Sequence, residues 1–260
     1  MTAFDLAGAG VLVTRPVDRA ESLAKLIRNM GGVPTSFPGI RIEPVERAVL
    51  KSILQGLAGI DLVIFVSPTA VQLGIPAIIE SFGTIDRLRV AAVGKSTAAE
   101  LRKFGLRNII VPREPGGSEA LADCSQLSQV ADRSVLLVRG EGGNDMLASI
   151  LEDRGARVSF LECYRRRLPD ANFSAIEPML RDGRIAAWIA TSGEILDNLF
   201  RLSGDHGDLL RSIPLFVNHP HVARRGFSQA VKVIFVTTGG DKGIAAGISL
   251  WFCRLRTSRS

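Results

Sequence analysis

One tyrosine occurs in the chain, Tyr164, and three arginines follow it directly, at positions 165, 166 and 167. A phenol keeps its proton at neutral pH, so it can act as a general acid, and neighbouring guanidinium groups favour anions. The same spacing is typical of a packing residue in a segment that crosses between domains, with arginine stems that cover apolar surface. Tyr164 is therefore a candidate catalytic acid, and the packing alternative stays open.

Residues that can cap a helix or bind an anion follow six of the predicted strands. Each of these turns precedes a predicted helix, so backbone N–H groups and the positive end of the helix dipole point out of the sheet edge, where they can hold carboxylates or phosphates. Ordinary capping explains any single turn, but six turns at one kind of edge favour an anion site. The turns are Thr14-Arg15-Pro16, Ser67-Pro68-Thr69, Gly94-Lys95-Ser96-Thr97, Arg139-Gly140-Glu141-Gly142-Gly143, Thr191-Ser192-Gly193 and Asn218-His219-Pro220.

The glycine loop after Arg139 matches nucleotide-binding motifs only in part. As a GxGxxG sequence it lacks the third glycine, since Asp145 stands there, although Glu162 is placed where an acid for a ribose would be. Gly94-Lys95-Ser96 resembles a phosphate-binding loop but lacks the glycine upstream. Nicotinamide and ATP are therefore disfavoured as ligands. A metal is disfavoured too, because no acidic residue or cysteine completes a ligand set with His219-Pro220-His221.

The composition favours a small anionic partner. The chain has 260 residues, of which 46% are hydrophobic, enough for one large domain or two medium ones with a real core. Its net charge is +6, which favours an anion, although most charged side chains are expected on solvated surface. Aromatic residues make up only 6%, so stacking platforms for single-stranded bases, and hence nucleic-acid binding, are disfavoured.

The cysteines and the apolar runs indicate the cellular compartment in which the protein is expected. Cys124, Cys163 and Cys253 are an odd number of thiols with no CxxC spacing. The first ten residues carry no basic region ahead of an apolar run, and no apolar stretch reaches the roughly 18 residues that span a bilayer. We expect reduced thiols, a cytoplasmic protein and no membrane contact.

Strands and helices alternate along the chain, which predicts an α/β fold with buried parallel sheets. Ser67 and Asp18 are expected to cap helices, and Gly155 is expected to end one in the left-handed conformation. Expected strands are 11–14, 62–66, 89–93, 108–111, 135–138, 158–161, 186–190, 215–217 and 231–236. Expected helices begin near residues 18, 68, 95, 118, 146, 192, 221 and 240, and the one from 118 is expected to continue to 127.

The sequence repeats itself at a distance of about 124 residues. VLVTR, which ends at Arg15, aligns with VLLVR, which ends at Arg139, and Gly31 aligns with Gly155. Ser67 falls one position away from Ser192. A repeat of this length indicates duplication of a domain and not a solenoid.

Several of these motifs, in this order, resemble the uroporphyrinogen-III synthase family. They are VLVTRP, PGIRIEP, FVSPTAV, AVGKSTAAEL, VRGEGGNDML with RGARV, ECYRR, and VNHPHVA. No single motif is unique, but their order and spacing are specific. The sequence departs from some relatives at His221-Val222, where those carry paired threonines, which leaves His219 or backbone amides to take that role.

The resemblance implies two Rossmann-like lobes with parallel sheets, one inserted in the other, joined by two extended linker strands. The end-built lobe would comprise 1–38 and 168–260, the inserted lobe 45–158, and the linkers 39–44 and 159–167. The lobes would then not coincide with the two halves of the repeat. The first βαβ unit of each half would belong to the lobe that contains the rest of the other half.

The resemblance also implies a reaction: cyclisation of hydroxymethylbilane, with loss of water and inversion of the last pyrrole ring, in a cleft between the lobes. It implies no metal or organic cofactor, a monomer, and a transient contact with the preceding enzyme of the pathway. Tyr164 matches the family tyrosine that helps the hydroxyl leave. The expected substrate-binding residues are Arg15, Ser67, Lys95, Thr97, Arg139, Gly140, Gly142, Ser192 and His219.

Two other functions fit the sequence less well. A two-lobed binding protein for a polyanionic small molecule would share the fold and the charge, but periplasmic binders of this kind need an export signal. A dinucleotide-dependent oxidoreductase would need the complete glycine motif that Asp145 interrupts.

Overall fold

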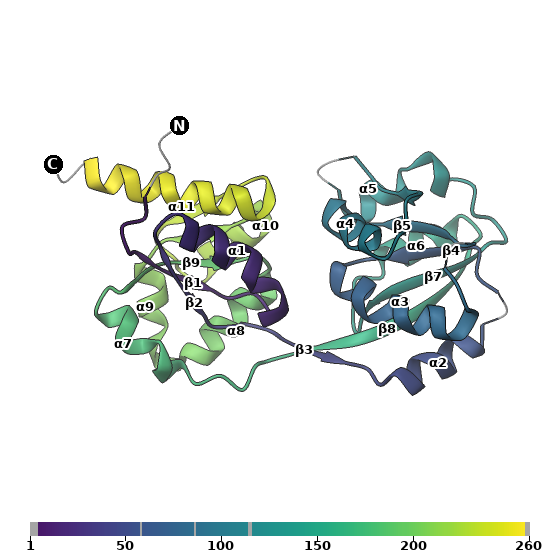
Figure 1. Cartoon of the computed structure of the whole chain (residues 1–260), viewed down its shortest axis with the longest axis horizontal. Helices are drawn as coiled ribbons and strands as arrows, with labels where there is room; N and C mark the ends of the chain where they lie inside the picture. Colours follow the sequence, from purple (N-terminus) through teal and green to yellow (C-terminus); the bar gives the residue numbers. More distant parts are fainter. Residues whose placement is uncertain (1–4, 58, 86, 114–115, 258–260) are drawn as a thin grey trace. The chain divides into compact units, whose positions relative to one another are not determined.

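The computed structural model describes residues 5–57, 59–85, 87–113 and 116–257; the ends of the predicted end-built lobe, 1–4 and 258–260, lie outside them. The chain divides into two compact units (Figure 1). We call Met1–Arg41 with Arg167–Ser260 the terminal unit, and Ile42–Arg166 the inserted unit. The chain therefore passes twice from one unit to the other.

The terminal unit holds a five-stranded sheet in the order β11-β10-β9-β1-β2, and all of its pairings are parallel. Its strands are β1 (Gly10–Val13), β2 (Val33–Ser36), β9 (Ile185–Ala190), β10 (Leu215–Val217) and β11 (Ile234–Val236). Its helices are α1 (Val17–Asn29), η2 (Phe173–Ala175), α7 (Glu177–Arg181), α8 (Gly193–Ser203), η3 (Gly204–His206), α9 (Gly207–Ser212), α10 (Pro220–Ser228) and α11 (Gly240–Thr257).

The inserted unit holds a six-stranded sheet in the order β3-β8-β7-β4-β5-β6. Pairings among β4 to β8 are parallel. The strands are β3 (Arg41–Pro44), β4 (Leu62–Phe65), β5 (Arg89–Ala92), β6 (Ile109–Ile110), β7 (Ser134–Gly140) and β8 (Arg157–Arg167). The helices are α2 (Arg47–Gln55), α3 (Pro68–Phe82), α4 (Lys95–Lys103), α5 (Ser118–Ala122), η1 (Ser125–Leu127) and α6 (Met146–Asp153).

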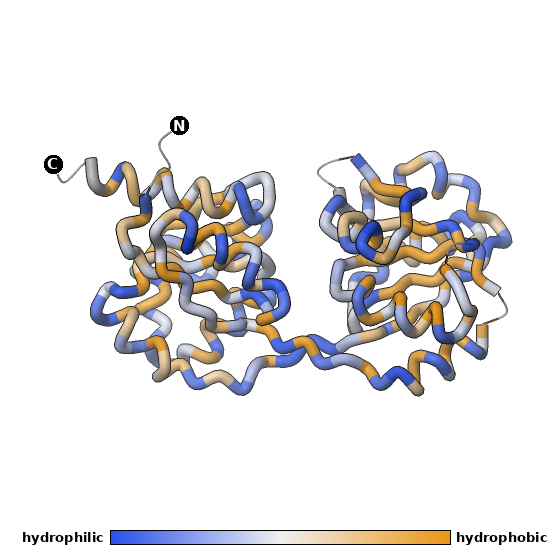
Figure 2. The backbone as a smooth tube through the Cα atoms, in the orientation of Figure 1, coloured by the Kyte–Doolittle hydropathy of each residue, from blue (hydrophilic) through white to orange (hydrophobic). Residues whose placement is uncertain are grey.

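Continuous apolar runs form the central strands because both faces of a parallel sheet are covered by helices. All four residues of β1 and of β4 are buried, as are five of the six in β9. Figure 2 shows this as hydrophobic strands inside each unit and more hydrophilic segments around them. The largest fully buried side chains include Trp188 of β9 and Phe65 of β4. Each unit therefore has its own core.

Each sheet has a point at which the order of its strands reverses. In the terminal unit β2 follows β1 on one side, and β10 and β11 follow β9 on the other, so the reversal lies between β1 and β9. In the inserted unit β5 and β6 extend from β4, and β8 extends from β7, so it lies between β4 and β7. In open α/β sheets ligands bind outside the carboxyl ends of the strands at such a point.

The predicted fold class, two mostly parallel α/β sheets, is confirmed. Several local expectations were wrong; the strand expected over 231–236, for example, begins only at Ile234. Pro16 and not Asp18 is the N-cap of α1. Gly140 is the last residue of β7 and not part of the loop. The helix expected over 118–127 ends at Ala122, and a separate 3-10 turn follows.

The repeated segments of the sequence end up in different units. β1, α1 and β2 belong to the terminal unit, whereas their counterparts β7, α6 and β8 belong to the inserted unit. Within the described residues, no helix is long and apolar enough to cross a bilayer.

Candidate active site

The carboxyl edge of the inserted sheet brings together most of the predicted site residues. The relevant strands β8, β7, β4 and β5 are neighbours in the sheet, so the segments that follow them meet at one edge. The residues at this edge are Ser67 after β4, Lys95 and Thr97 in the first turn of α4, Arg139, Gly140 and Gly142 at the end of β7, and Tyr164 in β8.

Two hydroxyl groups meet at this edge. The phenol oxygen of Tyr164 lies 3.1 Å from Oγ of Ser67. Ser67 is the N-cap of α3, and its Oγ accepts a hydrogen bond from the backbone N–H of Ala70 at 3.0 Å. Tyr164 is only 4% exposed, while Ser67 is half-buried. The serine is thus the member of the pair that is nearer to solvent.

A glycine lets the tyrosine reach across a strand. Tyr164 lies on β8 and Ser67 follows β4, with β7 between them. The register shifts between Arg139 and Gly140, so that Gly140 faces Tyr164. A Cβ atom on Gly140 would lie 2.5 Å from Cε2 of the ring. Only a residue without a side chain allows the phenol ring to pass over the end of β7.

The cysteine beside this tyrosine is inert. Cys163 lies at the shift of register, fully buried, and its Sγ is 3.4 Å from the carbonyl oxygen of Arg139. Burial raises the pKa of the Cys163 thiol to about 12. A thiol that keeps its proton is a poor nucleophile and metal ligand, so Cys163 acts as a packing residue.

Arg139 is held by contacts within its own unit. Its guanidinium group lies 3.0 Å from Oε1 of Glu162, 3.3 Å from the carbonyl oxygen of Gly143 and 2.5 Å from Oδ1 of Asp145. The group also stacks 3.9 Å above the centre of the Phe160 ring. These contacts tie the glycine loop to β8, and the expected contact of Arg139 with a ligand stays a prediction.

The first turn of α4 places its two candidate residues differently. Lys95 is exposed, whereas Thr97 is only 2% exposed. The helix begins after Gly94, whose backbone is extended. The exposed Lys95 is thus the candidate for a ligand contact in this turn, and Thr97 packs inward.

The carboxyl edge of the terminal sheet collects the remaining three candidates. Arg15 follows β1 and forms an ion pair with Asp241, 2.5 Å apart. Ser192 caps α8 by accepting the backbone N–H of Ile195 at 3.2 Å. His219 caps α10, with Nδ1 accepting the backbone N–H two residues later at 3.1 Å. β10, β9 and β1 are adjacent, so this edge also presents capped helix ends beside an arginine.

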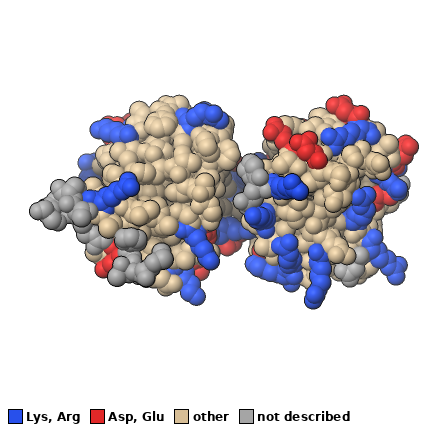
Figure 3. Space-filling model, turned by 90° about the horizontal axis from the view of Figure 1, so that it is seen from above, with Lys and Arg blue, Asp and Glu red and all other residues tan. Residues whose placement is uncertain are grey.

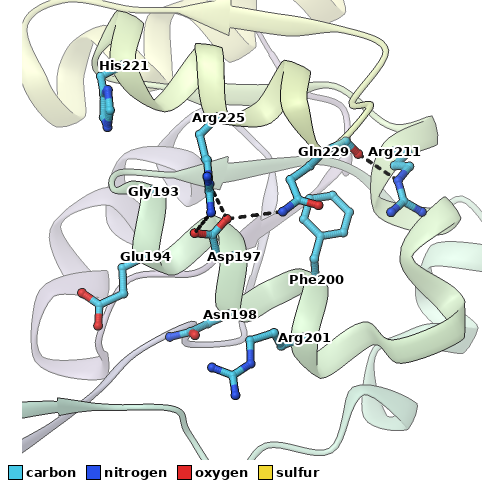
Figure 4. Close-up of a pocket in the computed structure, with 10 residues that line it drawn as sticks. All are labelled: Gly193, Glu194, Asp197, Asn198, Phe200, Arg201, Arg211, His221, Arg225 and Gln229. Carbon is cyan, nitrogen blue, oxygen red and sulfur yellow. Dashed lines mark hydrogen bonds and ion pairs between the residues drawn. The ribbon is translucent and has the colours of Figure 1, made fainter.

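A groove of about 1100 Å³ starts at this edge, next to Ser192, and runs between α8 and α10 (Figure 4). An ion pair crosses it: Asp197 on α8 accepts two hydrogen bonds from Arg225 on α10, at 2.8 and 2.9 Å, and this carboxylate raises the pKa of Arg225. Arg201 is exposed in the groove. The lining residues are Gly193, Glu194, Asp197, Asn198, Phe200, Arg201, Arg211, His221, Arg225 and Gln229.

The sequence arguments missed this groove. The spacing of Glu194, Asp197 and Arg201 places them on one face of α8, which is a signal that the sequence does carry. The pairing with Arg225 depends on how α10 packs against α8, which the sequence does not reveal. Among the described residues, no group of three His, Cys, Asp or Glu side chains is placed to hold a metal ion.

The chain resembles known proteins over most of its length. Residues 21–238 match the family model described as uroporphyrinogen-III synthase HemD. The protein named uroporphyrinogen-III synthase of Salmonella typhimurium is 33% identical over 234 residues, which cover 86% of this chain and 94% of that protein. Its namesake from Escherichia coli is 31% identical over 196 residues, covering 74% of this chain and 79% of that protein.

Solved structures share the fold. A uroporphyrinogen III synthase variant from Thermus thermophilus aligns with a TM-score of 0.62 and 21% identity, covering 94% of this chain and 99% of that one. The uroporphyrinogen-III synthetase of Helicobacter pylori aligns with a TM-score of 0.57 and 11% identity, covering 94% and 99%. The match to the family model over residues 21–238 and the 33% identity with the Salmonella protein show that the chain belongs to the uroporphyrinogen-III synthase family.

Proposed function

We propose that the protein is a uroporphyrinogen-III synthase, which closes the linear tetrapyrrole hydroxymethylbilane with loss of water and inversion of the last ring. Membership of the family supports the reaction, and one structural observation supports the site: the hydroxyl pair of Tyr164 and Ser67 at the carboxyl edge, beside the reversal point of the sheet.

The hydroxyl group of the substrate needs a proton in order to leave as water. Ser67 Oγ accepts a hydrogen bond from the backbone N–H of Ala70 and lies within hydrogen-bond distance of Tyr164. A serine oxygen has two acceptor positions and one proton. In our proposal Ser67 donates its proton to the leaving hydroxyl and takes the phenol proton of Tyr164. The greater burial of Tyr164 favours this order over direct donation.

The carboxylates of the substrate require positive groups. Its acetate and propionate side chains fit the exposed amide ends of capped helices, which attract anions. We propose contacts at the inserted edge through Ser67, Lys95 and the backbone near Gly140 and Gly142, and at the terminal edge through Arg15, Ser192 and His219. Arg201 in the groove is a further proposed contact. The buried position of Thr97 and the internal contacts of Arg139 support structural roles for those two.

The test is the isomer that forms from fresh hydroxymethylbilane. Without an enzyme the substrate closes to the symmetric isomer, so a synthase is recognised by the inverted, type III isomer after chromatographic separation. We expect type III to dominate when the protein is added. An unchanged proportion of isomers would contradict the proposed function.

We also propose that the protein works as a monomer in the cytoplasm and makes a transient contact with the enzyme that supplies hydroxymethylbilane. The tendency of the free substrate to close to the other isomer supports such a contact. The described cysteines are free thiols, which supports a reducing compartment. Size-exclusion chromatography with light scattering tests the oligomeric state.

A further inference from the structure

A cavity of about 750 Å³ lies where the inserted sheet ends at β6, away from the candidate active site. α4 begins at the carboxyl end of β5 and returns towards the amino end, so Arg102 in its last turn lies near Arg89, the first residue of β5. The cavity therefore lies at the amino side of the sheet. Its lining residues are Arg87, Leu88, Arg89, Val90, Arg102, Asn108, Ile109, Ile110, Val111 and Gln126.

A second cavity, of about 680 Å³, continues the first. Val111 and Gln126 line both, so the two form one groove along β6, which we call the edge groove. The second cavity adds Arg113, Asp123 and part of α5 and η1. β6 is the last strand of its sheet, and among the described residues no strand pairs with its outer side. The groove thus follows a free sheet edge.

The edge groove is positively charged. The first cavity is lined by three arginines and, among the residues that the structure describes, by no carboxylate. Arg89 donates to the carbonyl oxygen of Gln126 at 2.9 Å, while Arg87 and Arg102 have no side-chain partner within the described ranges. Arginines elsewhere in this unit form ion pairs, for example those at positions 47, 133, 139 and 165. Three arginines without a carboxylate repel one another and favour an anion.

Basic side chains are unevenly distributed on the inserted unit. Figure 3 shows Lys and Arg side chains along the lower margin of this unit, and most of the Asp and Glu side chains in this view lie towards the other margins. Such an uneven distribution of charge attracts acidic partners.

We propose that the edge groove docks an extended acidic segment of a partner polypeptide, which adds to the sheet as a strand beside β6. A free edge offers backbone N–H and C=O groups to a strand. Ile109, Ile110 and Val111 are half-buried and apolar, so they suit the alternate side chains of such a strand, and the arginines suit its carboxylates. The four residues from Asn108 to Val111 match about four residues of a partner strand, roughly 13 Å. A small anion would contact only the arginines and would not pair with the edge of β6.

The docking proposal is independent of the proposed reaction, because its residues lie away from Tyr164 and Ser67. A fluorescent peptide of alternating glutamate and valine is the probe, and binding is followed by anisotropy with the full-length protein. We expect saturable binding that weakens about tenfold or more between low and physiological salt. Activity with hydroxymethylbilane should be the same with and without the peptide.

Two comparisons make the test specific. The double variant Arg87→Gln with Arg102→Gln should weaken binding at least tenfold, whereas Arg133→Gln, which changes an exposed arginine of the same unit outside the groove, should leave it unchanged. A peptide methylated at alternate backbone nitrogens keeps its charge but loses edge hydrogen bonds, so it should bind at least tenfold more weakly. Circular dichroism confirms that the variants fold.

Three outcomes would overturn the docking proposal. The first is equal binding by wild type and the double variant. The second is equal binding of the methylated peptide, which would show attraction by charge alone. The third is displacement of the peptide by inorganic triphosphate or a short oligonucleotide at equal charge concentration, which would assign the groove to a small anion or to nucleic acid.

Discussion

Oη of Tyr164 lies 3.1 Å from Oγ of Ser67, across the end of the strand that separates them. The contact joins residues 97 positions apart and places a phenol proton next to the half-buried cap of α3. The buried phenol can supply a proton and the serine hydroxyl lies nearer to solvent, so the two residues can be tested together as one proton relay.

Tyr164→Phe removes the phenol hydroxyl group and keeps the aromatic ring. We expect formation of the type III isomer to slow by about 100-fold, the usual contribution of a general acid, and stability to fall by about 1 kcal/mol for the lost hydrogen bond. Single-turnover rates and urea unfolding measure the two effects. A variant as fast as the wild type would remove Tyr164 from the mechanism.

Ser67→Ala should slow the reaction about as much as Tyr164→Phe, and the double variant should be no slower than either, because members of one relay are not additive. The substitution also removes a helix cap, at a cost of about 1 kcal/mol. Ser192→Ala removes the equivalent cap of α8, in the other unit. It should lose similar stability, and because Ser192 is a proposed substrate contact and not a member of the relay, its loss should raise KM and leave kcat close to that of the wild type. Independent, multiplicative losses at positions 67 and 164 would argue against the relay.

Gly140→Ala should displace the tyrosine ring, because the new methyl group would lie 2.5 Å from it. We expect a loss of about 1–3 kcal/mol, as for other overpacked sites, together with slower turnover. Gly94→Ala is the matched control, since its added Cβ would meet no atom within 4 Å. Thermal unfolding of both variants gives the comparison, and equal stability would show that the ring moves freely.

Arg139→Gln should act on stability. Arg139 is 8% exposed and contacts two carboxylates and an aromatic ring. Because Asp145 and Glu162 are themselves partly exposed, the lost packing and ion pairs should together cost about 1–3 kcal/mol. Arg165→Gln breaks the exposed pair with Glu141 and should cost less than about 1 kcal/mol. If the variant at position 139 instead kept its stability and raised KM, Arg139 would be a ligand-binding residue.

Cys163 should resist alkylation in the folded protein near pH 8. With its pKa raised by burial from 9.0 to about 12, its thiolate fraction there is about 10⁻⁴, whereas the half-buried Cys124 and Cys253 should react first. Mass spectrometry of tryptic peptides gives the order.

The raised pKa of Cys163 also sets the sign of its effect on stability. Below about pH 9 the thiol is protonated in both states, so its stabilising contribution is complete; it is lost as the pH rises towards 12, because the unfolded chain releases the proton first. Cys163→Ala should lack this alkaline loss. Fast alkylation of Cys163 in the folded protein would show that the core around this thiol opens to the reagent.

Local patterns predicted most of the strands and the Ser67 cap of α3, although not the N-cap of α1. The apolar run at 62–66 and the Ser67-Pro68 pair have one physical solution, a buried strand followed by a capped helix, and β4 and α3 have this form. The candidate residues were predicted to follow strand ends, and the parallel sheets collect them at one edge of each unit. Periodicity and capping act over a few residues, so they can be read directly from sequence.

Contacts that depend on strand order could not be predicted in this way. That Tyr164 reaches Ser67 requires β8, β7 and β4 to be neighbours and Gly140 to lie under the ring, and no short-range pattern contains that order. The internal contacts of Arg139 could not be predicted for the same reason, so it was expected to contact a ligand. Its stack on Phe160 and its pair with Glu162 follow from the register of β7 with β8. The groove between α8 and α10 likewise depends on helix packing.

The placement of β1 between β2 and β9 has a consequence for the order in which the protein folds during synthesis. Val13 of β1 pairs with Ile189 of β9, so β1 leaves the ribosome long before the partner strand that it needs. Residues 42–166 form a compact unit from one continuous stretch and can complete their sheet meanwhile. The emerging amino-terminal βαβ segment is then the part of the nascent chain with an unprotected apolar edge, and the part that a chaperone would be expected to cover.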